Sequence, residues 1–283
     1  MAGGAGTLCI LAGGGALPLI VAQEAMAAGR AVHILAIEGS FGDLAAAPCP
    51  ATAVSVGQVG GILELLQRVG CSGLVICGYV ERPELAQLKL DFGAIVNLPR
   101  LASMMLGGDN HLLITIVRFF EAKGIPVVGV QDVAPGLLAG PGALGRMRAS
   151  SEGDSDIARG FEIVRALGGL DIGQAAVVSK GYTLAVEAAE GTDALLERVA
   201  ELRRRRNRPG GRRHGVLVKR AKPGQDRRVD LPTVGPRTVE LAAAANLAGI
   251  GVHAGSVLLI ERERLLAIAD AAGVFVVGVR DEG

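Results

Sequence analysis

Short apolar runs alternate with helical patterns along the first half of the chain. Strands are expected at residues 7–12, 31–37, 73–77 and 126–130. Helices are expected after the glycine cluster up to Ala28, at 60–69 and at 112–122, with a further helical pattern at 85–106 that Pro99 interrupts. Continuous apolar strands between helices are typical of a parallel sheet covered on both faces. The pattern therefore predicts an α/β fold with a Rossmann-like domain over residues 1–133.

The alternation breaks at residues 134–145, which are rich in glycine and proline and are expected to form a linker. Beyond it, helices are expected at residues 155–167, 193–204, 238–248 and 262–272. Strands are expected at 175–179, 184–188, 215–220, 256–260 and 274–279. Residues 146–283 are thus expected to form a second α/β domain, with a less regular order of elements.

Composition agrees with two folded domains and excludes some functions. Half of the 283 residues are hydrophobic, and 42 glycines supply turns. The 29 Lys and Arg nearly balance the 28 Asp and Glu, and aromatic residues make up only 3%, so no nucleic-acid surface is expected. The four cysteines lack CxxC spacing and are interpreted as reduced structural residues. With no signal peptide and no long apolar window, we expect a cytoplasmic protein.

The first candidate site is the glycine cluster that follows the first predicted strand. Gly13 and Gly15 fill two positions of a dinucleotide fingerprint, but Pro18 replaces its last glycine. What remains is a glycine turn before a helix N-terminus, which favours a general anion site. The alternative is a tight turn without a ligand.

Two further acidic segments precede predicted helices. Asp109, which follows two glycines, is interpreted as a helix cap or as a nucleotide or metal contact. Glu187 and Glu190 are candidate metal ligands or bases, and Thr192 or Asp193 is the expected cap of the helix that follows.

Residues 219–233 form the most informative segment of the second domain. They place five cationic residues beside Asp226 and Asp230 around a Pro-Gly turn. Cations can offset charge on a transferring phosphoryl group, and a carboxylate can hold Mg²⁺. A charged surface hairpin is the alternative. Nearby, the arginine-rich run 203–213 is interpreted as a solvated loop, with weak attraction to an anionic membrane as a second option.

Absent motifs narrow the choice of chemistry. The four histidines show no pair at ligand spacing, so a two-metal phosphoesterase centre is not expected. The sequence also lacks a Walker A pattern and a Gly-x-Ser-x-Gly elbow.

Residues 222–236 read KPGQDRRVDLPTVGP, and this motif resembles the UDP-2,3-diacylglucosamine pyrophosphatases of the lipid A pathway that lack metallophosphoesterase motifs. The resemblance extends to residues 12–18 (AGGGALP), 159–162 (RGFE), 171–175 (DIGQA) and 187–193 (EAAEGTD). It implies Mg²⁺-dependent hydrolysis to UMP and 2,3-diacylglucosamine 1-phosphate (lipid X), with water attacking the sugar-side phosphorus. The run 203–213 departs from the family pattern, and no catalytic role is assigned to it.

The resemblance also implies which residues act. The expected catalytic residues are Asp226, Lys219, Lys222 and Arg227, with Asp226 as the metal ligand. The expected substrate contacts are Gly14, Gly15, Ala16, Leu17, Gly78, Asp109, Gln174, Lys180, Glu187, Gln225 and Thr233. The implied partner is a lipid-linked nucleotide sugar, so peripheral contact with the inner membrane is compatible with the sequence, as is a homodimer.

Two other hypotheses stay open at this point. An NAD-dependent or nucleotide-sugar oxidoreductase would use the glycine turn, and a non-enzymatic carrier would bind lipid or nucleotide. Hydrolysis predicts release of UMP, the oxidoreductase predicts an absorbance change with NAD(P), and the carrier predicts binding without turnover.

Overall fold

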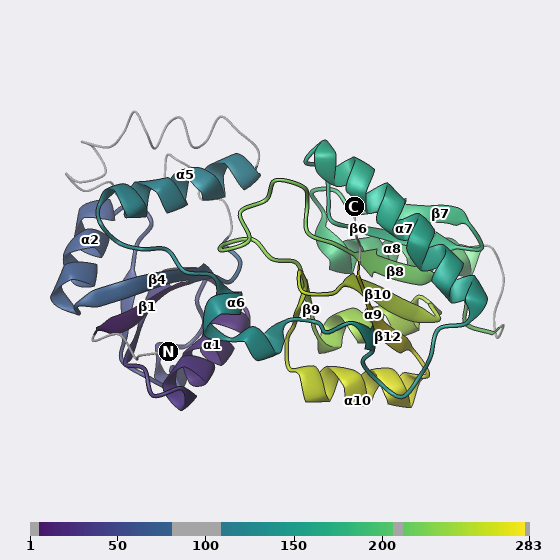
Figure 1. The fold of residues 1–283 in the computed structure, drawn as a ribbon, viewed down its shortest axis with the longest axis horizontal. Coiled ribbons are helices and arrows are strands. Elements are labelled where there is room, and N and C mark those ends of the chain that lie inside the picture. The colour runs from purple at the N-terminus through teal and green to yellow at the C-terminus, as the bar shows by residue number, and fades with distance from the viewer. Residues whose placement is uncertain (1–5, 81–108, 206–211, 281–283) are drawn as a thin grey trace. The chain divides into compact units, whose positions relative to one another are not determined.

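The computed structural model describes residues 6–80, 109–205 and 212–280, and side chains in the second range from residue 112 onward. The chain divides into two compact units (Figure 1). The first contains Met1–Pro135 and Asp226–Asp230, and the second contains Gly136–Gln225 and Leu231–Gly283. The short segment Asp226–Asp230 therefore packs with the first unit although its neighbours in sequence belong to the second. Both units are α/β, which confirms the predicted fold class.

The sheet of the first unit is parallel, as predicted. Its strands run in the order β3-β2-β1-β4, with β1 at Thr7–Ala12, β2 at Val32–Ile37, β3 at Ala51–Val54 and β4 at Cys71–Cys77. The chain moves outward from β1 to β3 and then returns to the other side of β1. The topological switch point, where ligands bind in open α/β sheets, therefore lies between β1 and β4.

Helices cover both faces of this sheet. The helices are α1 (Leu17–Ala27), α2 (Val59–Arg68), α5 (Asp109–Ala122) and α6 (Val130–Val133), with a 3₁₀ turn η1 at Leu44–Ala46. Apolar residues of α2 and α5 share a core cluster with Cys9, Leu11 and Leu35, while α1 buries Val21 on the opposite face. Alternate residues of β1 thus serve two cores, which is why the strand is apolar throughout.

The strand expected at 126–130 is reduced to one parallel bridge between Leu74 and Val127, because α6 begins at Val130 and ends the extended segment. The helical pattern at 85–106 lies outside the described residues.

The second unit holds a mixed sheet in the order β5-β12-β10-β8-β6-β7. The three central strands β12, β10 and β8 are parallel, and β5, β6 and β7 join them antiparallel to their neighbours. The strands are β5 (Gly142–Ala143), β6 (Ala175–Ser179), β7 (Tyr182–Val186), β8 (Val216–Lys219), β10 (Gly249–His253) and β12 (Phe275–Val279). A separate parallel pair joins β9 (Thr233–Val234) to β11 (Leu258–Leu259).

Helix α7 (Ser151–Gly169) lies against one face of this sheet and α8 (Gly191–Arg205), α9 (Pro236–Ala244) and α10 (Arg262–Ala272) lie against the other (Figure 1). Ser150 caps α7 by accepting a hydrogen bond from the Gly153 amide at 3.2 Å. Residues of β8 alternate between the faces: Val218 contacts the α7 side and Leu217 contacts the α8–α10 side. A short 3₁₀ turn, η3 (Pro135–Leu137), lies where the two units join in sequence.

The central strand β10 is missing from the sequence-based prediction. Its glycines lower strand propensity, so the pattern Gly-Ile-Gly-Val-His gives no clear strand signal. The structure shows why glycine is needed there. A Cβ on Gly249 would lie 2.3 Å from the Phe275 ring, and one on Gly251 would lie 3.0 Å from Ile157. The strand predicted at 256–260 is the two-residue β11.

Candidate active site

In the first unit, the glycine turn lies at the switch point between β1 and β4. Gly14 and Tyr79 form an antiparallel bridge, in which the Gly14 amide donates to the Tyr79 carbonyl at 2.7 Å. The Gly13 amide donates to the Cys77 carbonyl at 2.9 Å. The two strand ends are therefore joined through backbone, and these two amides are not available to an anion.

Close packing explains the glycines of this turn. A Cβ on Gly14 would lie 2.5 Å from the Tyr79 ring, and one on Gly78 would lie 2.7 Å from the Gly14 carbonyl oxygen. Gly15 differs, because its φ of +88° requires glycine while an added Cβ would meet no atom within 4 Å. Gly15 and Ala16 are exposed, and Leu17 begins α1, so the part of the turn open to a ligand is this end.

In the second unit, several of the expected site residues meet at the carboxyl end of β8. Lys219 ends β8 and is 5% exposed. Its Nζ donates to the Thr192 hydroxyl at 2.7 Å and to the Thr233 carbonyl at 3.0 Å. The Thr192 hydroxyl in turn donates to Glu187 Oε1 at 2.6 Å. Glu187 is also 5% exposed, and its Oε2 accepts from the Gln174 amide at 3.0 Å.

The loop that follows β8 begins with an ordered turn. Gly224 has a φ of +73°, and Pro223 precedes it, which is the sequence pattern of a type II turn. Gln225 Oε1 accepts from the Lys222 amide at 2.8 Å and so closes the turn with its side chain. The Lys222 ammonium pairs with Asp171 at 2.7 Å.

Asp226 and Arg228 form a forked ion pair within the first unit. Arg228 donates from Nε to Asp226 Oδ1 at 3.0 Å and from Nη2 to Oδ2 at 2.7 Å, while its amide donates to Oδ1 at 3.1 Å. Arg228 also pairs with Glu121 of α5 at 2.6 Å. The hydrogen bonds from Arg228 hold the pKa of the Asp226 carboxyl below its usual range. Asp226 is therefore an anion at neutral pH and a weak base.

The remaining expected residues fall in different places. Lys180 lies in the tight β6–β7 hairpin with a φ of +53°, at the opposite end of β6 from Gln174, and the structure does not bring it to the Lys219 cluster. Arg227 is exposed in the Asp226–Asp230 segment. Asp109 begins α5, and its side chain is outside those described.

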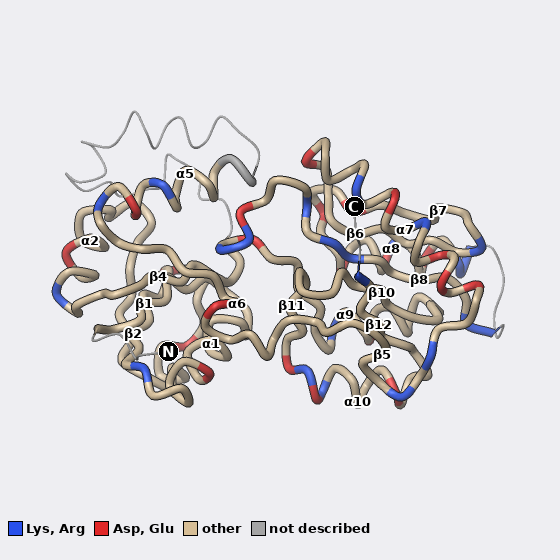
Figure 2. Tube along the Cα trace, viewed as in Figure 1, with Lys and Arg blue, Asp and Glu red and all other residues tan. Residues whose placement is uncertain are grey.

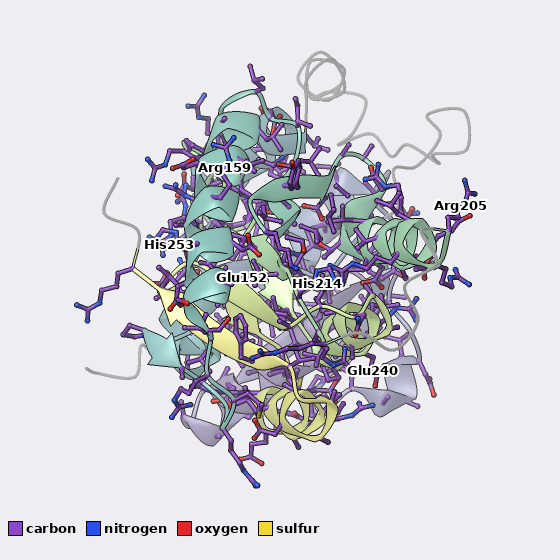
Figure 3. All side chains as sticks on the ribbon, turned by 90° about the vertical axis from the view of Figure 1, so that its right-hand side faces the viewer. Glu152, Arg159, Arg205, His214, Glu240 and His253 are labelled. Atoms are coloured by element: carbon purple, nitrogen blue, oxygen red, sulfur yellow. The ribbon has the colours of Figure 1, made fainter. Side chains whose placement is uncertain are left out.

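The arginine run is not simply a solvated loop, and that interpretation is wrong for its two ends. Arg203 donates to the carbonyls of Ala245, Asn246 and His214 at 2.9, 2.6 and 2.8 Å. Arg213 donates to the Ala243 carbonyl at 2.7 Å. The carbonyls of Ala243, Ala245 and Asn246 lie at the C-terminus of α9, which carries partial negative charge, so the two arginines cap that helix. Burial lowers the pKa of Arg203. In contrast, Arg205, the last residue of α8, is exposed and pairs with Glu201 of the same helix (Figure 3).

Sequence reasoning did not single out three partners in these clusters. Arg228 pairs with Asp226, and Asp171 pairs with Lys222. Glu121 pairs with Arg228, and both Glu121 and Asp171 are distant in sequence from their partners. Thr192 was expected only as a helix cap. The two-residue spacing of Asp226 and Arg228 is the single local signal that could have indicated their pairing.

The described residues contain no group of three or more His, Cys, Asp and Glu side chains suited to hold a metal ion. Asp226 offers one carboxylate, and the three hydrogen bonds from Arg228 occupy three of its four lone-pair positions, leaving one on Oδ2. Mg²⁺ in phosphate-binding sites takes one or two carboxylates from the protein and completes its shell with phosphate oxygens and water. The donor set thus fits a site completed by substrate and does not form a protein-only cage.

Across the described part of the chain, no helix combines the length and apolar character that crossing a membrane requires.

Known proteins provide the comparison for these features. Family models described as the LpxI N-terminal domain and the LpxI C-terminal domain match residues 7–137 and 140–277. A UDP-2,3-diacylglucosamine pyrophosphatase LpxI from Caulobacter vibrioides is 41% identical over 272 residues, which cover 96% of this chain and 97% of the relative. Among solved structures, CobK precorrin-6A reductase aligns over 98% of this chain and 89% of its own length, with 13% identity and a TM-score of 0.31. On the two family models and the full-length relative, the chain belongs to the LpxI family.

Proposed function

We propose that the protein hydrolyses the diphosphate of UDP-2,3-diacylglucosamine to UMP and 2,3-diacylglucosamine 1-phosphate in lipid A synthesis. The observation that carries this proposal is the 41% identity, over nearly the whole of both chains, to a protein named as that pyrophosphatase. The cation-rich loop after β8, with its ionised Asp226, supports it because a diphosphate needs charge neutralisation.

In the proposed mechanism, a water oxygen forms a bond to the sugar-side phosphorus. The bond from that phosphorus to the bridging oxygen breaks, and UMP leaves with the bridging oxygen. Asp226 would accept a hydrogen bond from the attacking water or ligate Mg²⁺. A role as a strong general base is disfavoured, because Arg228 keeps the pKa of this carboxyl low.

Mg²⁺ is part of the proposal. When bound, it supplies positive charge next to the diphosphate oxygens, and Asp226 Oδ2 is the protein atom that we expect to ligate it. Arg228 fixes the orientation of this carboxylate through its forked hydrogen bonds, so the lone pair that remains on Oδ2 has a defined direction.

The cations divide into two roles. We propose that Lys222 and Arg227 neutralise the diphosphate, because Lys222 follows the end of β8 closely and Arg227 is exposed beside Asp226. Lys219 is buried and bonded to Thr192 and Thr233, which favours a role in holding the loop. Gly15, Ala16 and Leu17 remain the proposed substrate contacts of the first unit, and the diacyl substrate gives the reason to propose peripheral contact with the inner membrane.

The proposal is tested by assaying UMP release from radiolabelled UDP-2,3-diacylglucosamine with and without EDTA. We expect turnover that EDTA abolishes and Mg²⁺ restores. In H₂¹⁸O, the label should appear in the sugar 1-phosphate. Label in UMP would reverse the assigned point of attack, and activity unaffected by EDTA would remove Mg²⁺ from the mechanism.

A competition assay with UDP-GlcNAc tests the lipid part of the proposal. Burial of apolar surface contributes roughly 25 cal/mol per Å², so acyl chains that bury a few hundred Å² favour the diacyl substrate by several kcal/mol before ordering costs. We expect strong preference for the diacyl substrate and lipid X co-purifying in native mass spectra. Equal hydrolysis of both substrates would point to a general nucleotide-sugar pyrophosphatase, and an absorbance change with NAD(P) would favour the oxidoreductase.

A further inference from the structure

Lys219 occupies an unusual position in the second sheet. Among the described residues, the strands of the two sheets contain no other Lys, Arg, Asp or Glu, and they are correspondingly tan in Figure 2. Lys219 is 5% exposed, and a buried ammonium group is costly unless polar groups surround it. A lysine kept at such a position needs partners whose geometry is well defined.

Thr192 supplies one of these partners and connects Lys219 to a carboxylate. Its hydroxyl accepts from Lys219 Nζ at 2.7 Å and donates to Glu187 Oε1 at 2.6 Å. A hydroxyl can do both at once, because it carries one donor and two acceptor positions. Serine shares this capacity, whereas valine, with nearly the same shape as threonine, has neither function.

The network lies at the base of the loop that carries Asp226. Lys219 is the last residue before this loop, residues 220–232, and Thr233 is the first residue after it. The bond from Lys219 Nζ to the Thr233 carbonyl, 3.0 Å long, therefore joins the two ends of the loop. The Thr192 hydroxyl also accepts from Lys219 Nζ and so helps to direct the ammonium group towards the Thr233 carbonyl.

Glu187 is connected to the first residue of the same loop through Gln174. Its Oε2 accepts from the Gln174 amide, and the Gln174 carbonyl accepts from the amide of Arg220, the first loop residue, at 3.0 Å. Glu187 also lies close to the N-terminus of α8, where partial positive charge favours a carboxylate. Both ends of the loop are thus connected to one hydroxyl and the carboxylate that it contacts.

We propose that Thr192 is a positioning residue for the pyrophosphatase reaction: its hydroxyl links buried Lys219 to buried Glu187 and so fixes the base of the loop that presents Asp226. The inference rests on the proposed function for its effect on turnover. Its effect on the loop itself does not depend on that function. Loss of the hydroxyl leaves the fold of both sheets in place and lets the base of the loop open.

The test compares Thr192→Val with Thr192→Ser. The matched control is Thr52→Val, which removes a hydroxyl hydrogen bonded to His33 at 3.0 Å in the first unit. We measure kcat and KM for UMP release and the hydrogen exchange of amides in residues 220–232. Thr192→Val should lower kcat about tenfold or more with a smaller change in KM, and it should speed exchange in the loop. The serine variant and the control should stay within about twofold of the wild-type protein.

Wild-type kcat and exchange in Thr192→Val would overturn the proposal, as would a serine variant that is as impaired as the valine variant. If the valine variant does not fold, Thr192→Ala replaces it: an impaired alanine variant beside an active serine variant supports the proposal, and equal kcat in both overturns it. If the wild-type protein releases no UMP, the proposed function fails, and the exchange rates still decide whether Thr192 holds the loop.

Discussion

In the first unit the strand ends at the carboxyl edge of the sheet meet through backbone, whereas in the second unit they are joined by buried side chains. Gly14 and Tyr79 pair directly at the end of β1 and β4, and glycine is required because the chains approach so closely. At the end of β8, Lys219, Thr192 and Glu187 form hydrogen bonds in the interior. The backbone junction leaves no room for larger side chains and carries no charge. The polar network can support a charged loop, but losing any one of its hydrogen-bonding groups leaves the others without partners.

The largest expected effect is on Asp226 in the charged loop. Asp226→Ala should fold and bind substrate but lose about 100-fold or more in kcat, because the carboxylate that orients water or metal is gone. The matched control is Asp193→Ala, which removes an exposed partner of Arg237 in the second unit. Near-normal turnover in the Asp226 variant would mean that the charged edge is not where catalysis occurs.

A pair of glycine variants compares the two edges directly. A Cβ on Gly173 would lie 2.1 Å from the Glu187 carbonyl oxygen, so Gly173→Ala must displace backbone beside the polar network. We expect a loss of about 2 kcal/mol in the free energy of unfolding and a lower kcat. Gly15→Ala meets no atom and should cost only about 1 kcal/mol through its positive φ, with weaker substrate binding as its main effect. Chemical denaturation and substrate titration measure both, and equal destabilisation of the two variants would remove the contrast.

A third comparison concerns two arginines of the run 203–213, one of which caps a helix while the other is exposed. Arg203→Ala leaves the carbonyls at the end of α9 without their donor and should destabilise the protein by about 2 kcal/mol. Arg205→Ala, in the same run, removes an exposed side chain and should change stability by less than about 0.5 kcal/mol. Thermal unfolding distinguishes them. Neither variant should alter kcat, and a fall in kcat for Arg205→Ala would reveal a role for the run in substrate binding.

The smallest expected effect is the pH dependence of the Asp226–Arg228 pair. Its contribution to stability is complete above the ordinary aspartate pKa of about 4 and is lost as the pH falls through the depressed pKa of the folded state. Arg228 is 35% exposed, so solvent limits this contribution to about 1 kcal/mol or less. Acid unfolding of Asp226→Asn should lack this component, and identical acid profiles would show that the pair contributes nothing measurable.

Much of the fold could be predicted because its signals are local. Apolar runs and glycine or proline breaks identified the parallel sheet of the first unit and most helices of both units. The strand β10 was missed because Gly249 and Gly251 lower its strand propensity. Glycine is needed at these positions because Phe275 and Ile157 pack directly against them, which only the structure shows. The segment 126–130 was predicted as a full strand but forms only one bridge, since periodicity does not show how soon the next helix begins.

The sequence by itself determined the α/β class and, through the motif at 222–236, the family. These follow from residue type and spacing along the chain, which need no partner. The tertiary structure decided which charges are available and which are structural. It buried Lys219 against Thr192, paired Asp226 with Arg228, turned Arg203 into a helix cap and placed Lys180 at a hairpin far along β6. The reason is physical: the state of a charged side chain depends on its burial and on partners that are distant in sequence, such as Glu121 and Asp171, and only the folded chain brings them together.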